Sequence, residues 1–156
     1  VKITIVNMKR ILITLALALF AIIGKAQVVP YQLGETVSEG QSEVTFKVYV
    51  FCDSKKELDQ AAYLAGIRCV MFEGIPGTKF SKPLLNEGER TLIDKHPAYF
   101  DELYGWRYAD YVKDCVILSK FKKSGVGKST LFEVTVKAFE LRKDLEKNNV
   151  KTKFGI

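Results

Sequence analysis

The sequence predicts a single compact α+β domain with a mainly antiparallel sheet, a β-hairpin and helices packed on one face. Apolar and polar residues alternate, as in strands, over 44–52, 115–122 and 132–138. Apolar residues recur at helical spacing between the first two of these segments and again at Leu141 and Leu145. The expected order is strand, helix, strand, two short helices, hairpin and helix, which favours helices on one face of the sheet.

The first strand, over 44–52, leads directly into a helix. Ser54 and Glu57 fit a capping box, in which a hydroxyl and a carboxylate satisfy the exposed amides of the first helical turn. The helix is expected to pack closely on the sheet through one face of mostly small residues. These residues are Leu58, Ala61, Ala62, Ala65 and Cys69.

One further strand and two short helices are expected before the hairpin. The apolar run 70–72 predicts the second strand, and a loop follows it. Asn86 is expected to cap the first short helix, with Glu89 three residues later, and Pro97 suits the first turn of the second. We interpret the aromatic face of the second helix as core rather than as a platform for a carbohydrate or a peptide. This face comprises Tyr99, Phe100, Leu103 and Tyr104, with Trp106 nearby.

The stretch SGVGKST, residues 124–130, ends like a phosphate-binding loop. The motif also requires a glycine five residues before its last glycine, where this chain has Lys122, and a helix after its lysine. The residues on both sides of the stretch alternate as strands do. We therefore interpret it as a hairpin turn in which Gly125 and Gly127 adopt positive φ, and we expect no nucleotide as a ligand.

The beginning of the chain predicts export. Lys9 and Arg10 precede an apolar stretch over 11–23, and small residues at 24–26 form a cleavage site, which together make a secretory signal peptide. The stretch is shorter than the roughly 20 residues of a membrane-spanning helix, although an uncleaved anchor remains the alternative. The expected divisions are an over-extended gene model over 1–7, a signal peptide over 8–26, an extended lead-in over 27–42, and the domain over 43–156.

Cleavage would remove most of the net positive charge. The chain holds 24 basic and 18 acidic residues, and four of the basic residues but no acidic residue lie in 1–26, so 24 − 4 − 18 leaves a net charge of +2. This balance gives no electrostatic footprint for nucleic acid, and we expect membrane contact only during export. The basic cluster Lys120, Lys122, Lys123 and Lys128 is typical of a solvated strand edge, although a binding patch remains open.

The cysteines and the single histidine predict no catalytic residue, metal site or cofactor. No cysteine belongs to a CxxC pair, and all three lie in apolar runs typical of buried thiols: Cys52, Cys69 and Cys115. One disulfide with one thiol left over stays possible in an oxidising compartment. The alternative to a non-enzymatic protein is a small periplasmic enzyme or ligand-binding protein with a cleft near Glu73, His96 and Trp106.

Several segments together resemble a family of small secreted proteins of Gram-negative bacteria: VTFKVYVFCDSKKELDQAAYLAGIRCVMFEGIPG, KPLL, HPAYFDELY, the hairpin and the closing KFGI. The resemblance covers most of residues 43–156. More distantly, the opening strand and alanine-rich helix are similar to small α+β domains of cell-envelope and flagellar assembly lipoproteins, although no cysteine follows the cleavage site here to carry a lipid. The resemblance implies an envelope location and carries over no functional residue.

These observations favour a non-enzymatic protein that is exported to the periplasm, the outer membrane or the cell exterior. We expect it to bind another envelope protein or to help in assembly. The expected contact surfaces are the loop over 74–85, with Phe80 exposed, and the lysine-bearing hairpin. The residues of this interaction surface are Phe80, Lys82, Trp106, Lys122, Lys123 and Lys128.

Overall fold

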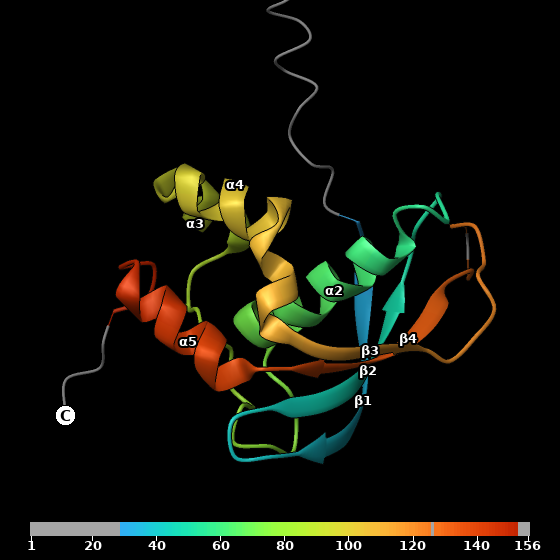
Figure 1. Ribbon diagram of the computed structural model, residues 1–156, viewed down its shortest axis with the longest axis horizontal. Helices are drawn as coiled ribbons and strands as arrows, with labels where there is room; N and C mark the ends of the chain where they lie inside the picture. Colours follow the sequence, from blue (N-terminus) through green and yellow to red (C-terminus); the bar gives the residue numbers. More distant parts are fainter. Residues whose placement is uncertain (1–28, 126, 153–156) are drawn as a thin grey trace, which may run out of the picture.

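A computed structural model describes residues 29–125 and 127–152 (Figure 1). The expected signal peptide and the closing KFGI lie outside these residues. The described chain folds as one compact α+β domain in which four antiparallel strands form a sheet of order β1-β2-β4-β3, and helices gather on one of its faces. This confirms the fold class expected from the sequence. The strands are β1 (Tyr31–Glu39), β2 (Val44–Val50), β3 (Val112–Ile117) and β4 (Thr130–Val136).

The two central strands carry the alternation that the sequence shows. β2 pairs with β4 in unbroken register from Val44 opposite Val136 to Val50 opposite Thr130. Every second side chain of both strands is buried beneath the helices, and the residues between them lie on the helix-free face. On that helix-free face, the Thr45 and Thr135 hydroxyls are hydrogen-bonded at 2.8 Å across the pair.

Strand β1 forms within the segment expected to be an extended lead-in. It is a polar edge strand, and its pairing with β2 is irregular between Leu33 and Thr36 and again between Thr36 and Ser38. These irregularities break the two-residue alternation, so the sequence carries no periodic signal for this strand. Residues 31–39 therefore belong to the sheet.

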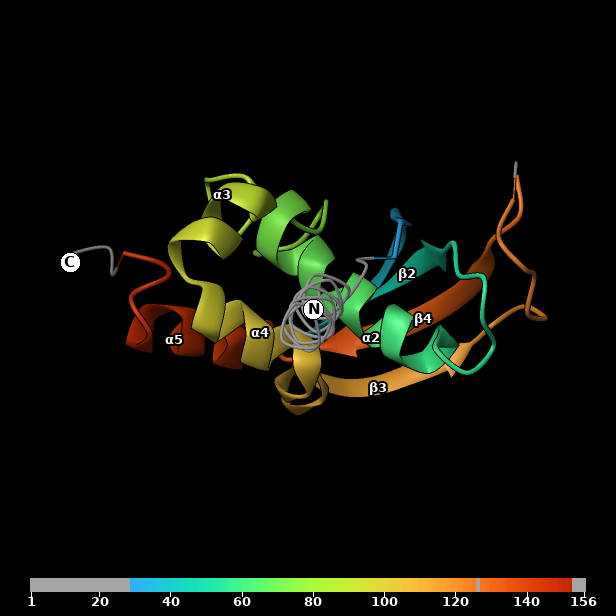
Figure 2. The ribbon, with the colours of Figure 1, turned by 90° about the horizontal axis from the view of Figure 1, so that it is seen from above.

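Helix α2 (Leu58–Arg68) packs closely across the inner face of the sheet, as its small residues predict (Figure 2). All the residues expected on its packing face are buried. Gly66 marks the closest approach, because a Cβ atom there would lie 2.7 Å from Cγ1 of Val134. The sequence analysis did not include Gly66 among the packing residues.

The second strand expected at 70–72 is wrong. Residues Cys69–Glu73 instead form a π-helical turn, η1, that continues directly from α2. Cys69, Val70 and Met71 are fully buried there, so the apolar run reflects burial and not strand pairing. Such short apolar runs fit a buried helical turn as well as a strand.

The two expected side-chain caps are also absent. Helix α2 begins after Glu57 and α3 (Glu89–Lys95) begins after Gly88, both without a side-chain cap. Ser54 lies in a turn before α2, where its carbonyl accepts a hydrogen bond from the Glu57 amide at 3.2 Å. Asn86 lies too far upstream of α3 to cap it.

The remaining helices agree with the sequence pattern. Pro97 occupies the first turn of α4 (Pro97–Gly105), whose Phe100, Leu103 and Tyr104 are buried. A 3₁₀ turn, η2 (Arg107–Tyr111), leads from α4 to β3. Leu141 and Leu145 of α5 (Ala138–Lys147) are fully buried. No helix within residues 29–125 and 127–152 is long and apolar enough to cross a membrane.

Strands β3 and β4 form the expected antiparallel pair, but the strand expected over 115–122 ends at Ile117, and residues 118–122 belong to the loop that leads to β4. At its tip the Lys128 amide donates to the Gly125 carbonyl at 3.0 Å. Gly127 has a φ of 69°, whereas Gly125, also expected to be left-handed, does not adopt positive φ. Strand β4 begins at Thr130, so the helix that a phosphate-binding loop requires after its lysine is replaced by a strand.

Candidate binding groove

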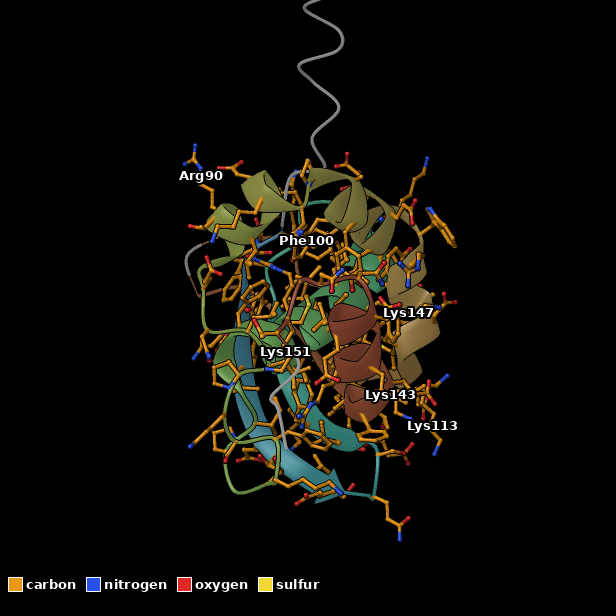
Figure 3. The ribbon with its side chains drawn as sticks, turned by 90° about the vertical axis from the view of Figure 1, so that its left-hand side faces the viewer. Arg90, Phe100, Lys113, Lys143, Lys147 and Lys151 are labelled. Carbon is orange, nitrogen blue, oxygen red and sulfur yellow. The ribbon has the colours of Figure 1, made fainter. Side chains whose placement is uncertain are left out.

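An open groove of about 660 Å³ lies between α5, the β1–β2 turn and the loop that follows η1. Among the described residues, four basic side chains and no acidic one line it: Lys79, Lys82, Arg142 and Lys151. Its apolar lining comes from Phe80, Pro83, Leu84 and Phe139. In Figure 3, Lys151 lies between α5 and this loop, whereas Lys147 lies on the opposite side of α5. A hollow of this size with a few convergent charges is typical of a binding site.

The loop over 74–85 is shaped by its own hydrogen bonds. Gly74 has a φ of 78°, and a Cβ atom there would lie 2.3 Å from the Ser81 carbonyl oxygen, so the turn requires glycine. The Ile75 amide donates to the Phe80 carbonyl at 2.8 Å. The Thr78 hydroxyl donates to the Ile75 carbonyl at 2.8 Å and accepts from the Phe80 amide at 3.0 Å.

This geometry turns Phe80 inward, so the expectation that Phe80 is exposed is wrong. Only 8% of Phe80 is exposed, because the closed loop packs its ring against the core. Phe80 therefore contributes to the wall of the groove and does not project from the surface. Lys82, the other residue expected in this loop to contact a partner, is exposed and lines the groove.

Hydrogen bonds hold the loop over 74–85 in place on two sides. On one side, the Thr36 hydroxyl donates to the Pro76 carbonyl at 2.7 Å, and the Lys79 amide donates to Glu39 Oε1 at 3.0 Å. On the other side, the Leu84 and Leu85 amides donate to carbonyls of the π-helical turn at 3.2 and 2.9 Å. The lysines of the loop are thus carried on a fixed backbone.

Two of the cations that line the groove lie near carboxylates outside the groove. Arg142 Nε donates to Glu146 Oε1 at 2.9 Å, one turn along α5, and Lys79 Nζ lies 4.0 Å from Glu39 Oε1. Lys151 Nζ donates to the Leu84 carbonyl. Burial and the neighbouring Arg142 lower the pKa of Lys151, against the opposing effect of Glu146. The shift reflects the partly buried position of Lys151 beside Arg142.

The sequence did not indicate three of these cations: Lys79, Arg142 and Lys151. They come from a loop, a helix and the segment after that helix, so only the fold brings them together. The other residues of the expected interaction surface lie elsewhere. Trp106, 64% exposed, follows α4. Lys122, Lys123 and Lys128 belong to the β3–β4 loop, which lies at the opposite end of the sheet (Figure 1).

The alternative cleft near Glu73, His96 and Trp106 corresponds to neither depression described here. His96 precedes α4 and Trp106 follows it, so the length of this helix, about 14 Å, separates their backbones. The groove and a smaller neighbouring hollow of about 250 Å³ are lined by other residues.

Other charged groups form two internal networks that hold the helices together. In the first, Arg68 Nε and Nη2 donate to the two Glu89 oxygens, both at 2.8 Å. The Tyr104 hydroxyl donates to Glu89 Oε1 at 2.6 Å, and Arg68 Nη1 donates to the Val29 carbonyl at 3.0 Å. Burial and the Glu89 carboxylate raise the pKa of Tyr104 far above its ordinary value.

The second network centres on Asp144 of α5. Its Oδ2 accepts from the Tyr99 hydroxyl at 2.8 Å, and its Oδ1 accepts from Arg107 Nη2 at 2.7 Å. The same guanidinium nitrogen donates to the Tyr111 hydroxyl at 2.8 Å. Burial and Asp144 raise the pKa of Tyr99 far above its ordinary value, and burial raises that of Tyr111 to about 12. This network joins α4, η2 and α5.

The three cysteines are free thiols. Burial raises the pKa of Cys69 well above its ordinary value. Burial, together with the negative charges of Asp59 and Asp114, raises the pKa of Cys115 to about 12. Neither thiol is therefore activated as a nucleophile at neutral pH. Within residues 29–125 and 127–152, no group of three or more His, Cys, Asp or Glu residues could hold a metal ion.

Comparison with known proteins finds no family model, no curated protein and no solved structure that matches this chain.

Proposed function

We propose that the protein is an exported, non-enzymatic binding module and that its basic groove holds an acidic segment of a partner protein in the cell envelope. The observation that carries the proposal is a groove of about 660 Å³ that, within residues 29–125 and 127–152, is lined by four basic side chains and no acidic one. Charge complementarity of this kind selects a partner and accelerates its association.

The mixed lining of the groove favours a peptide over a small inorganic anion. Phe80, Pro83, Leu84 and Phe139 offer apolar surface between the cations. A segment that combines carboxylates with aliphatic or aromatic side chains would use both parts of this lining. The exposed Lys82 and the half-buried Arg142 would contact the carboxylates.

Location in the envelope is the second part of the proposal. It is supported by the signal-peptide pattern over 8–26 and by the likeness to small secreted proteins of Gram-negative bacteria. An envelope partner would meet the groove after export and folding of the domain.

Site-specific photocrosslinking in the cells that produce the protein tests both parts. A photoreactive residue at position 82 should give an adduct with an envelope protein, and the crosslinked peptide should be rich in Asp and Glu. The adduct should disappear when Arg142→Glu and Lys79→Glu are introduced. A photoreactive residue at Lys147, on the opposite side of α5, is the matched control. Equal adducts from positions 82 and 147, or an adduct indifferent to the charge reversals, would contradict the proposal.

A further inference from the structure

The smaller hollow of about 250 Å³ adjoins the basic groove. The two depressions share three lining residues: Leu84, Asn86 and Lys151. At this junction Leu84 is buried, Lys151 is half-buried and Asn86 is exposed. A segment that is bound in the groove therefore reaches the hollow without leaving the surface of the protein.

The lining of the hollow is apolar where it is buried and polar where it is exposed. Four apolar lining residues are between 2% and 8% exposed: Leu84, Leu85, Leu92 and Val150. Three polar lining residues are exposed: Asn86, Glu87 and Thr152. Since an apolar cavity of about 150 Å³ is large enough for a benzene molecule, the hollow has room for one aromatic or large aliphatic side chain.

Backbone hydrogen bonds hold the walls of the hollow in place. The Val150 and Lys151 amides donate to the Leu145 carbonyl at 3.0 and 3.1 Å, which fixes the chain where α5 ends. On the opposite wall, the Leu85 amide donates to the Met71 carbonyl at 2.9 Å. The hollow is therefore already formed before a ligand binds, which lowers the entropic cost of binding.

The hollow and the groove differ in charge. Among the described residues, Glu87 is the one acidic residue that lines the hollow, whereas the groove is lined by basic residues alone among its charged groups. The Glu87 side chain is 49% exposed and accepts a hydrogen bond from Lys95 Nζ. An acidic side chain in the hollow would meet this carboxylate and would lose water to the buried apolar lining. The charges thus direct acidic side chains to the groove and an uncharged one to the hollow.

We propose that the hollow is a specificity pocket, which takes one aromatic or large aliphatic side chain of the acidic segment beside the carboxylates that the groove binds. The inference rests on the proposed function of the groove. Side chains of an extended segment alternate, so two that point toward the protein are separated by one residue. The recognised pattern is therefore an acidic residue, any residue and an apolar residue, in one chain direction or the other. Asn86 at the junction offers its side-chain amide to the backbone of the segment.

Two short peptides with blocked ends separate the hollow from the groove. In both, two glutamates alternate with serine, and the last residue is phenylalanine in one peptide and alanine in the other. The reversed sequences test the other chain direction. Fluorescence anisotropy should show, in one direction, at least about fivefold tighter binding of the phenylalanine peptide, because its ring is buried. The binding of both peptides should weaken as salt rises.

Two variants test whether the hollow causes this preference. Thr152→Trp should fill the hollow from its exposed rim, abolish the preference and leave the affinity for the alanine peptide unchanged. Lys147→Trp, on the opposite side of α5, is the matched control and should keep the preference. A peptide with glutamate in place of the phenylalanine should bind no more tightly than the alanine peptide, and Glu87→Lys should raise its affinity several-fold.

Equal affinities for the phenylalanine and alanine peptides overturn the specificity pocket and leave the groove as a site for acidic segments. Absence of binding by every peptide overturns both proposals. A preference that survives Thr152→Trp overturns the pocket, because the aromatic side chain then binds elsewhere. A preference that emerges only after removal of residues 153–156 overturns it as well, because these residues, which follow Thr152 directly, are then the occupant of the hollow.

Discussion

Two groups of basic residues in this protein have different surroundings. Arg68 and Arg107 are internal, and each meets a carboxylate that also accepts a hydrogen bond from a tyrosine hydroxyl. The groove cations line a surface hollow into which no carboxylate of the described part of the chain reaches. The internal arginines are buried with their carboxylates, whereas the groove cations lie at the surface, where Arg142 and Lys79 have carboxylate neighbours outside the groove. The first group therefore stabilises the domain, and we propose that the second contacts a ligand through the exposed Lys82 and the half-buried Arg142.

The largest expected effect comes from removing the carboxylate of an internal network. Asp144→Ala should lower the free energy of unfolding by about 3 kcal/mol, because Arg107 would lose the carboxylate to which it is hydrogen-bonded and keep only Glu102, 3.9 Å from its Nη1. The Asp144 and Arg107 side chains are only 16% and 17% exposed. Urea denaturation measures the change.

Glu146→Ala is the matched control on the same helix. Glu146 pairs with Arg142 one turn away, and the Arg142 side chain is 43% exposed. Removal of the Glu146 carboxylate should lower the free energy of unfolding by about 0.5 kcal/mol or less. Equal losses for Asp144→Ala and Glu146→Ala would remove the distinction between the two groups of basic residues.

The second effect concerns arginine geometry. Arg68→Lys should cost about 1–2 kcal/mol, because a lysine cannot make the two parallel hydrogen bonds to Glu89. Lys82→Arg in the groove should leave the melting temperature unchanged, because Lys82 is exposed. If Arg68→Lys left the free energy of unfolding unchanged, the Glu89 network would not depend on the guanidinium.

The third effect is a loss of stability at high pH. Folding raises the tyrosine pKa values above their ordinary value of 10.0, to about 12 for Tyr111 and further for Tyr99 and Tyr104. Above pH 10 the unfolded chain loses these protons first, so the stability that they provide is complete below pH 10 and declines as the pH rises toward and beyond 12. Denaturant titrations between pH 8 and 12 should show this decline.

Tyr104→Phe separates the tyrosine contribution from general alkaline effects. The variant should lose about 1 kcal/mol at neutral pH, because Glu89 loses the hydroxyl donor. Its stability should then fall less steeply above pH 10 than that of the wild type. A parallel decline in both proteins would exclude Tyr104 as a source of the pH dependence.

The smallest expected effect on stability belongs to the groove. Lys82→Glu should change the free energy of unfolding by less than about 0.5 kcal/mol, as for most exposed substitutions. A loss of several kcal/mol would mean that Lys82 belongs with the structural cations.

The sequence predicted the elements whose burial follows a regular period. The alternation of β2 and β4 and the small residues of α2 correspond directly to buried positions. Strand β1 was missed because its pairing is irregular and most of its residues are exposed. The run 70–72 was misassigned because a short apolar run shows no periodicity, so its composition does not separate a strand from a helical turn.

The candidate site was harder to predict than the fold. Lys82 was among the expected contact residues, and Phe80 was expected to be exposed although a closed loop buries it. Lys79, Arg142 and Lys151 are distant in sequence and converge only through the packing of the loop against α5. The sequence did not predict the internal networks for the same reason. Glu89 and Asp144 are 21 and 37 residues from the arginines that they contact.

The measurement that tests the central claim most directly is a salt-dependent titration of the purified protein with a short fluorescent peptide of alternating glutamate and leucine. We predict saturable binding that weakens as salt rises and is lost in Lys82→Glu/Arg142→Glu. Lys147→Glu and the same peptide with glutamine in place of glutamate serve as controls. Binding that is absent, or that is equal for the glutamate and glutamine peptides, would contradict the assignment of the groove as a site for acidic segments.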